Sequence, residues 1–497
     1  MARKDLLTDL INSLSTNEKR YFTLFSSISP GEQNFKKLFK ALDGEPGYDS
    51  KVINQKLGNT RMNIAYEKAY LQKMLLKSMR NYNEDGTTEI SIHNSLIDIE
   101  VLFNKQQYDL ALVFIKKAIR DAESKERFAL LLQLMGWEKR CMMRLGRYVD
   151  LEKQYIKGGK KESEIIALLE NASQYRALQY YVLSVVSLKG NVTRASDKKK
   201  LAAVIKHPLM KSADRAKSFY AKMIYYEILT NWYHHGFELK KAYTTTRKVL
   251  QLFEKNAKWI DQNPQAYFSF IGNYFNRALA LDEMKEAKEA IDKIERLINT
   301  FETKLPVSQI KEMRATLIER KLIYFVFTFD YKKAAHLAES LIPEIEKPKA
   351  GYRQGFYVIF YFYASLSFFH LKNFEKALTY QRKIIDQFDD TVRMDFVLMT
   401  HVLHFLTHYE LKHNSMLAYL LKSVQRFMLT RGLGNKANKT ILEFFGELNK
   451  ASNNPQKTKD VIANYHAQLL PYKNDHSQNV VMETLDLLKW MEAKLKG

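Results

Sequence analysis

Four of the twelve histidines lie within thirteen residues, in the segment HVLHFLTHYELKH at 401–413. Spacings of three and four place His401, His404 and His408 on one face of a helix, and imidazoles on one helical face can bind zinc. Such a site usually adds a cysteine or a carboxylate, and the sequence offers no evident candidate. We therefore expect no metal, and interpret these histidines as a polar stripe facing a groove or as core side chains with satisfied ring nitrogens.

The sequence gives no sign of a catalytic site. It contains no Walker loop and no GxGxxG, GxSxG or HExxH motif. Acidic residues alternate with lysines, as at 283–296, in a pattern typical of a solvated helical face. The single cysteine, Cys141, excludes an intramolecular disulfide, and its helical context favours a buried thiol. We expect no enzyme, no cofactor and no metal, although catalytic residues that converge only in three dimensions stay an alternative.

Positive charge is concentrated in one part of the chain. The net charge is +23, and residues 191–260 alone carry fifteen basic and five acidic groups. The basic patch comprises Arg194, Lys198, Lys199, Lys200, Lys206, Lys211, Arg215, Lys217 and Lys222. One interpretation is contact with nucleic-acid phosphates, which would weaken steeply with salt. The other is an ordinary solvated helix surface, since the interleaved aromatic residues have the helical spacing of a core.

The composition indicates which elements carry these residues. The 18 glycines and 9 prolines make up about 5% of 497 residues, roughly half the usual share, which favours long helices. The start of the chain carries Asp5 and Asp9 where a signal peptide needs an apolar core. The longest apolar run, 356–369, is shorter than the roughly 20 residues that cross a bilayer, and predicts a buried helix. We expect a soluble, cytoplasmic protein without a membrane span.

A pattern recurs along the chain. The segment YDLALVFIKKAI at 108–119 has an aromatic residue, a small residue three positions later and another seven beyond that. Related segments lie at 284–294, 331–341 and 374–384, and weaker ones centre on other positions. The anchors of the pattern are Ala111, Leu151, Ala202, Ala242, Ala287, Ala334, Ala377 and Ala418, about 44 residues apart on average. Helical segments rich in aromatic residues precede most anchors, at 128–145, 173–189, 214–234, 265–281, 308–328, 356–371 and 393–411. Turn-prone stretches, including KGGKK at 157–161 and DQNP at 261–264, separate the predicted pairs.

The motif YxxAxxxxxxA resembles the tetratricopeptide repeat over about residues 91–430. The resemblance implies an all-α fold, a right-handed superhelical solenoid of antiparallel helix pairs. The period of about 44 residues, against 34 in that family, indicates longer helices, and armadillo or HEAT geometry is the alternative.

We predict three parts of the chain. Residues 1–88 form a small N-terminal helical module, in which Ser15 and Glu18 make a capping box and a helix-turn-helix variant is one option. Residues 89–430 form the repeat array, after a linker at 83–88. Residues 431–497 supply the capping helices that a solenoid needs at its end.

The resemblance also implies a partner-binding groove lined by the first helix of each pair. Residues at or near the family's peptide-gripping positions are Asn231, Asn273, Asn276 and Arg320, with Phe362, Tyr363 and Phe369 as an apolar floor. Structural hydrogen bonding between repeats explains the asparagines equally well, and Glu227 stands where the family's clamp has a lysine. We expect a non-enzymatic scaffold that binds a peptide or protein. The alternative is a nucleic-acid-linked regulator whose N-terminal module is controlled by the array.

Overall fold

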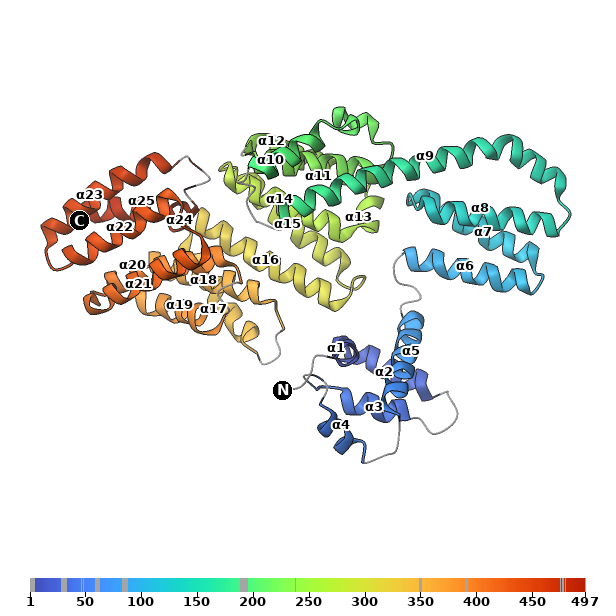
Figure 1. Cartoon of the computed structure of the whole chain (residues 1–497), viewed down its shortest axis with the longest axis horizontal. Coiled ribbons are helices and arrows are strands. Elements are labelled where there is room, and N and C mark those ends of the chain that lie inside the picture. Colours follow the sequence, from blue (N-terminus) through green and yellow to red (C-terminus); the bar gives the residue numbers. More distant parts are fainter. Residues whose placement is uncertain are drawn as a thin grey trace. The chain divides into compact units, whose positions relative to one another are not determined.

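The computed structural model is helical throughout its described residues and divides into two compact units, Met1–Glu170 and Asn171–Gly497 (Figure 1). It describes residues 5–27, 34–45, 47, 49–58, 63–82, 88–187, 195–236, 238–347, 351–388, 392–473, 475, 478 and 480–496, with the backbone alone at 88, 154–158, 187 and 195. No β-strand occurs in these ranges, as the shortage of glycine and proline predicts. Each unit is described by itself below.

The first unit begins with four short helices and one longer helix around their own core. They are α1 (Leu6–Ser13), α2 (Thr16–Ser27), α3 (Asn34–Leu42), α4 (Ser50–Lys56) and α5 (Ile64–Tyr82). The predicted capping box is confirmed, because the Ser15 N–H donates to Glu18 Oε2 at 2.7 Å and the Glu18 N–H donates to Ser15 Oγ at 3.3 Å. The long α5 packs on α2 and α3, where Phe22, Leu38 and Leu71 are buried. Residues 83–87 of the predicted linker lie outside the described residues.

The rest of the first unit is built from longer helices that pack on their sequence neighbours. They are α6 (Thr88–Asn104), α7 (Tyr108–Ser124), α8 (Phe128–Arg144) and the first part of α9 (Tyr148–Ser187). Cys141 is buried among them, as predicted. The prediction of a separator at 157–161 is wrong, because the 40-residue helix α9 runs through this segment without a break. A glycine inside a helix costs only about 1 kcal/mol, which the flanking strong helix formers offset.

The second unit contains one continuous hydrophobic core, from Tyr175 to Met491. Its short elements are α10 (Ala195–Ile205), the 3-10 turns η1 (Pro208–Lys211) and η2 (Ala213–Arg215), α13 (Lys258–Gln262), η3 (Leu470–Tyr472) and α24 (Val480–Thr484). Its longer helices are α11 (Phe219–His235), α12 (Leu239–Glu254), α14 (Pro264–Ala280), α15 (Met284–Phe301), α16 (Val307–Phe327), α17 (Tyr331–Ile345), α18 (Gln354–His370), α19 (Phe374–Gln387), α20 (Met394–Glu410), α21 (Asn414–Arg431), α22 (Lys436–Ala451), α23 (Pro455–Leu469) and α25 (Leu487–Lys496).

These helices alternate as the sequence predicts. We call α11, α14, α16, α18 and α20 the A helices, and α12, α15, α17, α19 and α21 the B helices. Each B helix packs on the A helix before it and on the next long helix after it, which for α21 is α22, and α14, α16, α18 and α20 also contact one another in order. The A helices lie within a residue or two of the aromatic-rich segments at 265–281, 308–328, 356–371 and 393–411, so those predictions are confirmed.

The apolar run at 356–369 is a buried helix, as predicted. Every residue of α18 from Val358 to Phe369 is buried, because helices lie on several sides of it. None of the helices in the described ranges combines the length and the apolar character that a membrane crossing requires.

One tight turn recurs between the A and B helices. At 282, 329, 372 and 412 a non-glycine residue has φ between 57° and 59°, and the next residue donates its N–H five positions back, as from Asp330 to Phe325 O at 2.8 Å. The bond satisfies a carbonyl that the helix end leaves open. Successive turns lie 40 to 47 residues apart, which matches the spacing of the side-chain anchors.

Most small-residue anchors lie at helix contacts. The alanine side chains at 111, 242, 287, 334 and 377 are completely buried, whereas Leu151 and Ala202 are half-buried. Ala418 is exposed and Leu417 is buried instead, so the anchor predicted at 418 is wrong by one residue. In α21 the B-helix pattern is too weak to fix which face packs, because α21 lacks an aromatic residue three positions before the anchor.

Candidate partner-binding face

The structure places the four polar groove residues on three A helices of the second unit. Asn231 lies half-buried on α11, Asn273 and Asn276 lie exposed on α14, and Arg320 lies half-buried on α16. Their exposure leaves the predicted role open to them. We call one surface of the second unit the A face. It comprises Asn273 and Asn276 of α14, Arg320 of α16, and the parts of α18 and α20 next to them.

The order of side chains around α14 follows from helical geometry. Residues are 100° apart, so Gly272, Asn276, Asn273 and Arg277 follow one another around the helix. Gly272 faces α16, since a Cβ there would lie 4.0 Å from Arg320 Nη2. The two exposed asparagines therefore lie between Arg320 on one side and Arg277 on the other.

Arg277 is a buried cation without an acidic partner in the described part of the chain. Only 7% of it is exposed, its Nη1 donates to Asn273 O at 2.9 Å, and its buried Nε has no hydrogen-bond partner there. Burial lowers the pKa of Arg277 to about 10. A buried arginine held by one neutral carbonyl keeps most of its desolvation cost.

Arg320 is the centre of a second group of charged side chains, the arginine cluster. This cluster comprises Arg320, Arg353, Arg393, Glu319, Asp395 and Tyr363. The Arg320 guanidinium lies 5.3 Å from the centroid of the Phe275 ring, an arrangement favourable for a cation. Within the described ranges Arg320 makes no hydrogen bond or ion pair, and its Nε is buried.

Two ion pairs orient the other arginines of the cluster. Arg353 Nη2 donates to both oxygens of Glu319, at 2.9 and 3.1 Å, and Glu319 is 2% exposed. Arg393 donates from Nε and Nη2 to the two oxygens of Asp395, at 3.0 and 2.7 Å. Its guanidinium also lies 4.4 Å from the Phe396 ring centroid. The Arg393–Asp395 pair is two-pronged, which leaves the Arg393 guanidinium plane little freedom to turn, whereas Arg353 uses a single nitrogen.

Burial and mutual charge shift the titration of this cluster. Burial raises the pKa of Glu319 although three arginines act to lower it. Burial also lowers the pKa of Arg320 and raises the pKa of Tyr363. Glu319 and the Arg320 Nε are shielded from solvent, whereas the side chains of Arg353, Arg393 and Asp395 are partly exposed.

The three aromatic residues predicted as an apolar floor are buried. Phe362 is 0% exposed, and Tyr363 and Phe369 are 4% exposed each. Phe362 and Tyr363 pack on Phe396 of α20, and Phe369 packs on Phe374 of α19. The three rings belong to the core of the second unit. The prediction that they form an exposed apolar floor is therefore wrong.

No protein-family model matches the chain, and no curated protein matches it.

The sequence did not single out Arg277, Arg353 or Arg393. A usable signal was present, since Arg353 and Arg393 are 40 residues apart and each is the N-cap residue of an A helix. That recurrence has the spacing of the anchors. Glu319 gave no signal, because a buried carboxylate and a solvated one look alike in a helical pattern of alternating charges.

Glu227 and Asn231 lie one helical turn apart on α11. Glu227 accepts a hydrogen bond from Gln179 Nε2 at 2.7 Å, and burial raises its pKa. This carboxylate adds negative charge beside Asn231, which argues against an anion-binding role for α11.

The histidine stripe of α20 lies largely in the core. His404 hydrogen-bonds Gln381 Oε1 through Nδ1 at 2.9 Å, and burial lowers its pKa to about 3. His408 Nδ1 lies 3.0 Å from His413 Nδ1, and His401 packs on the Phe427 ring. In the described ranges no group of three or more histidine, cysteine or acidic residues is arranged to hold a metal ion.

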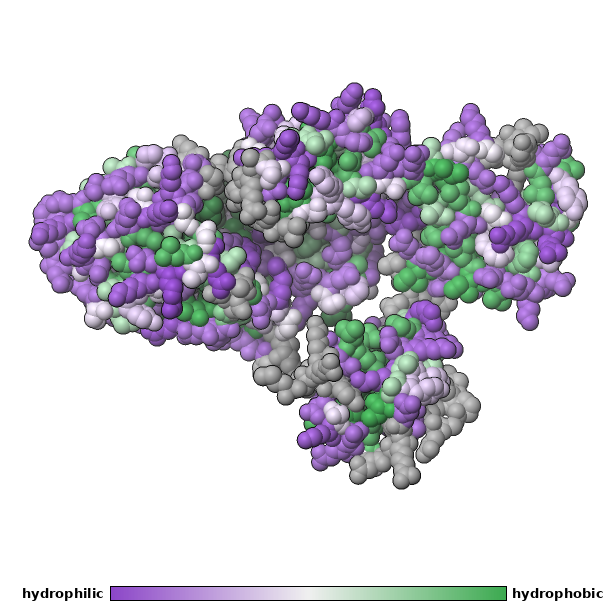
Figure 2. Space-filling view, viewed as in Figure 1, coloured by the Kyte–Doolittle hydropathy of each residue, from purple (hydrophilic) through white to green (hydrophobic). Residues whose placement is uncertain are grey.

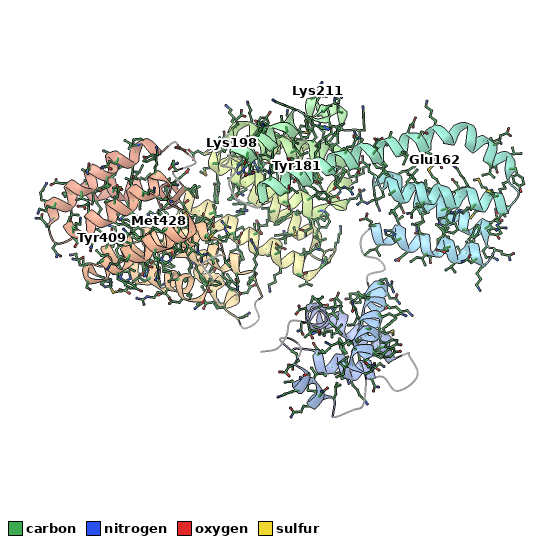
Figure 3. All side chains as sticks on the ribbon, in the orientation of Figure 1. Glu162, Tyr181, Lys198, Lys211, Tyr409 and Met428 are labelled. Atoms are coloured by element: carbon green, nitrogen blue, oxygen red, sulfur yellow. The ribbon has the colours of Figure 1, made fainter. Side chains whose placement is uncertain are left out.

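The basic patch forms one surface around α10, η1, η2 and the start of α11. These elements contact one another, and Figure 3 labels Lys198 and Lys211 on them. The exposed members are Lys198, Lys199, Lys200, Lys206, Lys211, Arg215 and Lys217, whereas Lys222 is half-buried and Arg194 lies outside the described residues. Lys200 lies 3.8 Å from Asp197, and no other described member has an ion-pair partner among the described residues. The surface is largely hydrophilic here (Figure 2).

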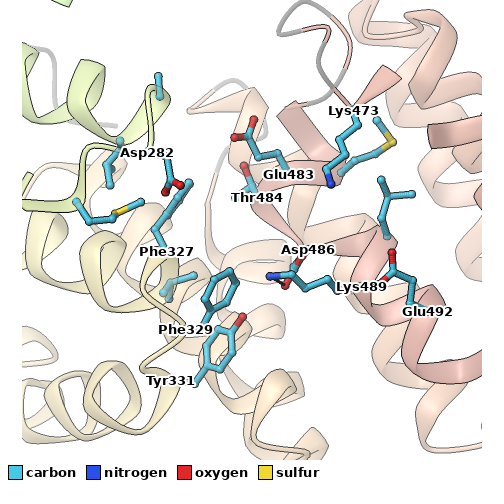
Figure 4. Close-up of a pocket in the computed structure, with 16 residues that line it drawn as sticks. Asp282, Phe327, Phe329, Tyr331, Lys473, Glu483, Thr484, Asp486, Lys489 and Glu492 are labelled. Carbon is cyan, nitrogen blue, oxygen red and sulfur yellow. Dashed lines mark ion pairs between the residues drawn. The ribbon is translucent and has the colours of Figure 1, made fainter. Parts of the chain in front are cut away.

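A pocket of about 440 Å³ lies between two helix turns and the C-terminal helices α24 and α25 (Figure 4). Asp282, Phe329 and Tyr331 line one side, and Asp486 and Lys489 line the other. Lys489 Nζ lies 3.5 Å from the Phe329 ring centroid and 3.3 Å from Asp486. A cation of the chain itself therefore covers the aromatic wall of this pocket.

Proposed function

We propose that the protein is a non-enzymatic helical-repeat scaffold, similar to tetratricopeptide arrays, that binds a peptide or protein segment along the A face. In that proposal the hairpins stack as a right-handed superhelix with the A helices on its concave side. A rigid surface of this kind lowers the ordering cost of binding an extended segment.

The observation that carries the proposal is the exposed asparagine pair between two arginines without acidic partners. Each amide of Asn273 and Asn276 offers a donor and an acceptor, which suits the main chain of an extended peptide. Neither Arg277 nor Arg320 has an ion pair with a described residue, and each has a buried Nε without a hydrogen-bond partner there. A partner that supplied hydrogen bonds and negative charge would offset those costs.

Affinity capture from the native lysate tests this function. The baits are the full chain, the double variant Asn273→Ala with Asn276→Ala, and a control double variant, Gln251→Ala with Gln387→Ala, which removes exposed amides from B helices. We expect the first bait and the control to retain the same protein partner, and the asparagine variant to lose at least about 90% of it, since a few groove contacts dominate affinity. Equal capture by all three baits would contradict a role for the A face.

The exposed lysines of the basic patch support a second function, a nucleic-acid-linked regulator. A gel shift at about 50 and 200 mM salt should show binding that falls steeply as salt increases. Changing Lys198, Lys199 and Lys206 to glutamate should abolish the shift, and the same change at the exposed Lys436, Lys439 and Lys457 should not. The absence of a shift at the lower salt concentration would remove this alternative.

A further inference from the structure

We propose that the arginine cluster is a binding site for an oxyanion, a carboxylate or phosphate group carried by the partner. The inference rests on the proposed function and specifies the chemistry of the segment that the A face accepts. It follows from the charges of the cluster, its unpartnered groups and the helix starts at Arg353 and Arg393.

The fixed charges of the cluster leave one positive charge over. Arg320, Arg353 and Arg393 contribute three positive charges, against the two carboxylates. Each carboxylate is already bound by one of the outer arginines. The remaining positive charge is that of Arg320, the arginine without an ion pair in the described part of the chain.

Two groups of the cluster make no hydrogen bond to the described residues, the Arg320 Nε and the Tyr363 hydroxyl. Tyr363 is 4% exposed, and its hydroxyl makes no hydrogen bond to any described residue. The Tyr363 ring packs on Phe396, whose ring also lies against the Arg393 guanidinium, and Arg320 and Arg393 are the charges that act most strongly on the hydroxyl. A buried donor such as the Arg320 Nε is uncommon and costly without a partner, and the Tyr363 hydroxyl likewise lacks an acceptor among the described residues. Both are donors, and an oxyanion is the ligand that accepts from both.

Two helix starts border the cluster. Arg353 and Arg393 are the N-cap residues of α18 and α20, and neither makes a side-chain cap hydrogen bond. A Cβ added at Gly355 would lie 3.5 Å from Arg393 Cγ, so the start of α18 approaches the α20 arginine closely. Helix N-termini carry partial positive charge and favour anions, which adds to the effect of the arginines.

The backbone at Arg393 is strained in a way that suits a binding site. Its φ of 55° and ψ of 54° are left-handed, a conformation that costs a residue with a Cβ roughly 1 kcal/mol or more. Such strain persists where the surroundings fix it, and it concentrates at ligand sites. Here it places the Arg393 side chain against Asp395 and Phe396.

The groups favour a two- or three-oxygen anion over other ligands. Planar guanidinium groups pair with carboxylate and phosphate oxygens in a two-pronged way, and a phenol hydroxyl adds one further donor. A cation would meet three arginines, and an apolar group would leave the hydroxyl and the guanidinium unpaired. An acidic side chain, a terminal carboxylate and a phosphorylated side chain share the required chemistry.

Thermal unfolding of the full chain with inorganic anions tests the site directly. Sodium phosphate and sodium acetate, each at about 20 mM, are compared with sodium chloride at the same ionic strength, because a ligand of the native state raises Tm by mass action. We expect at least one oxyanion to raise Tm. A response to acetate identifies a carboxylate source, and a response to phosphate alone identifies a phosphorylated one.

Two variants place the response in the cluster. Tyr363→Phe removes a hydroxyl without a described partner, so the unliganded protein should keep its Tm while the anion dissociation constant rises about fivefold or more. Arg320→Met should abolish the response. The matched controls are Tyr419→Phe and Arg426→Met, at exposed positions of α21, and both should respond like the unmodified chain.

Two results would overturn the proposal. One is an unmodified chain whose Tm is the same in chloride, acetate and phosphate. The other is a rise in Tm that Tyr363→Phe leaves unchanged, since the anion would then bind elsewhere, for example on the basic patch. These readouts involve no partner protein. A failed capture experiment would contradict the scaffold function but not the anion site. A Tm that does not respond to anions would contradict the anion site but not the scaffold function.

Discussion

Buried charged and titratable side chains in the second unit are held in different ways. Both oxygens of Glu319 accept from one arginine nitrogen, Arg277 donates to one backbone carbonyl, and His370 contacts the rings of Tyr331 and Phe369. Burial shifts the pKa of all three groups toward the neutral form. Groups of this kind couple the stability of the fold to pH.

His370 should make the second unit less stable in mild acid. The ring stacks on Tyr331 at 4.2 Å, its Nε2 is buried without a described partner, and burial together with Lys489 lowers its pKa to about 4. Below about pH 6.5 the histidine binds a proton in the unfolded state, whereas His370 in the native state stays neutral until the pH approaches 4. This contribution is complete above about pH 6.5 and is lost as pH falls toward 4.

Replacing His370 by phenylalanine keeps the ring stack and removes the titration. The unfolding free energy of both proteins should fall between pH 7 and pH 5. The decrease should be smaller in the variant than in the unmodified chain, by up to about 2 kcal/mol. Urea unfolding at several pH values measures this difference. His404 titrates in both proteins and cancels in the comparison. Parallel pH profiles for the two proteins would contradict the assignment, and His93→Phe, on the exposed surface of α6, is the control.

At the scale of elements, helix positions were predictable and side-chain convergence was not. Apolar periodicity fixes where the A helices lie, so the bounds of α14, α16, α18 and α20 agree with the sequence to within two residues, although α11 begins five residues later than predicted. The exposure of Asn273 and Asn276 also agrees with a groove role. Arg320 meets Arg353 and Arg393 only because α16, α18 and α20 lie side by side, and periodicity within one helix carries no information about a neighbour 40 residues away.

The same substitution, alanine to leucine, should change the stability of the protein by different amounts at two predicted anchors. Ala377 on α19 is completely buried, so Ala377→Leu forces extra methyl groups into a packed contact and should cost about 1 to 3 kcal/mol. Ala418 on α21 is exposed, and Ala418→Leu should change stability by less than about 0.5 kcal/mol. Chemical denaturation of both variants measures this. An equal cost at the two positions would mean that the burial of α21 is assigned to the wrong face.

The recurring turn between A and B helices makes a second prediction at this scale. Lys412 is exposed with a φ of 57°, a conformation that glycine adopts without steric cost. Lys412→Gly should therefore raise the unfolding free energy by about 0.5 to 1 kcal/mol.

The same change inside a helix provides the control. Lys422 is an exposed position in the interior of α21, and Lys422→Gly should lower the unfolding free energy by about 1 kcal/mol. Opposite signs for the two glycines would establish the left-handed turn. A loss at both positions would contradict it.

For the whole molecule, the relevant feature is that the apolar cores are separate. The buried residues of the first unit form two clusters, from Leu7 to Leu75 and from Ile92 to Ile165, and those of the second unit form one, from Tyr175 to Met491. The boundary between the units lies inside α9, at Glu170 and Asn171. A helix can continue through such a boundary, because its backbone hydrogen bonds are local.

We therefore expect the second unit to fold without the first. A fragment Asn171–Gly497 keeps the complete third core, including Tyr175, whose hydroxyl donates to Leu209 O at 2.7 Å. It should unfold cooperatively by circular dichroism, with a Tm within a few degrees of one transition of the full chain. In calorimetry the full chain should show more than one transition, since each separate cluster of buried residues can melt as its own cooperative unit. The unfolding enthalpy scales with residue number, at about 0.7 kcal/mol per residue. The transition of the second unit should therefore have about twice the enthalpy of the transitions of the first unit, which has about half as many residues. A single two-state transition for the full chain, together with an unfolded fragment, would show that the two units stabilise each other.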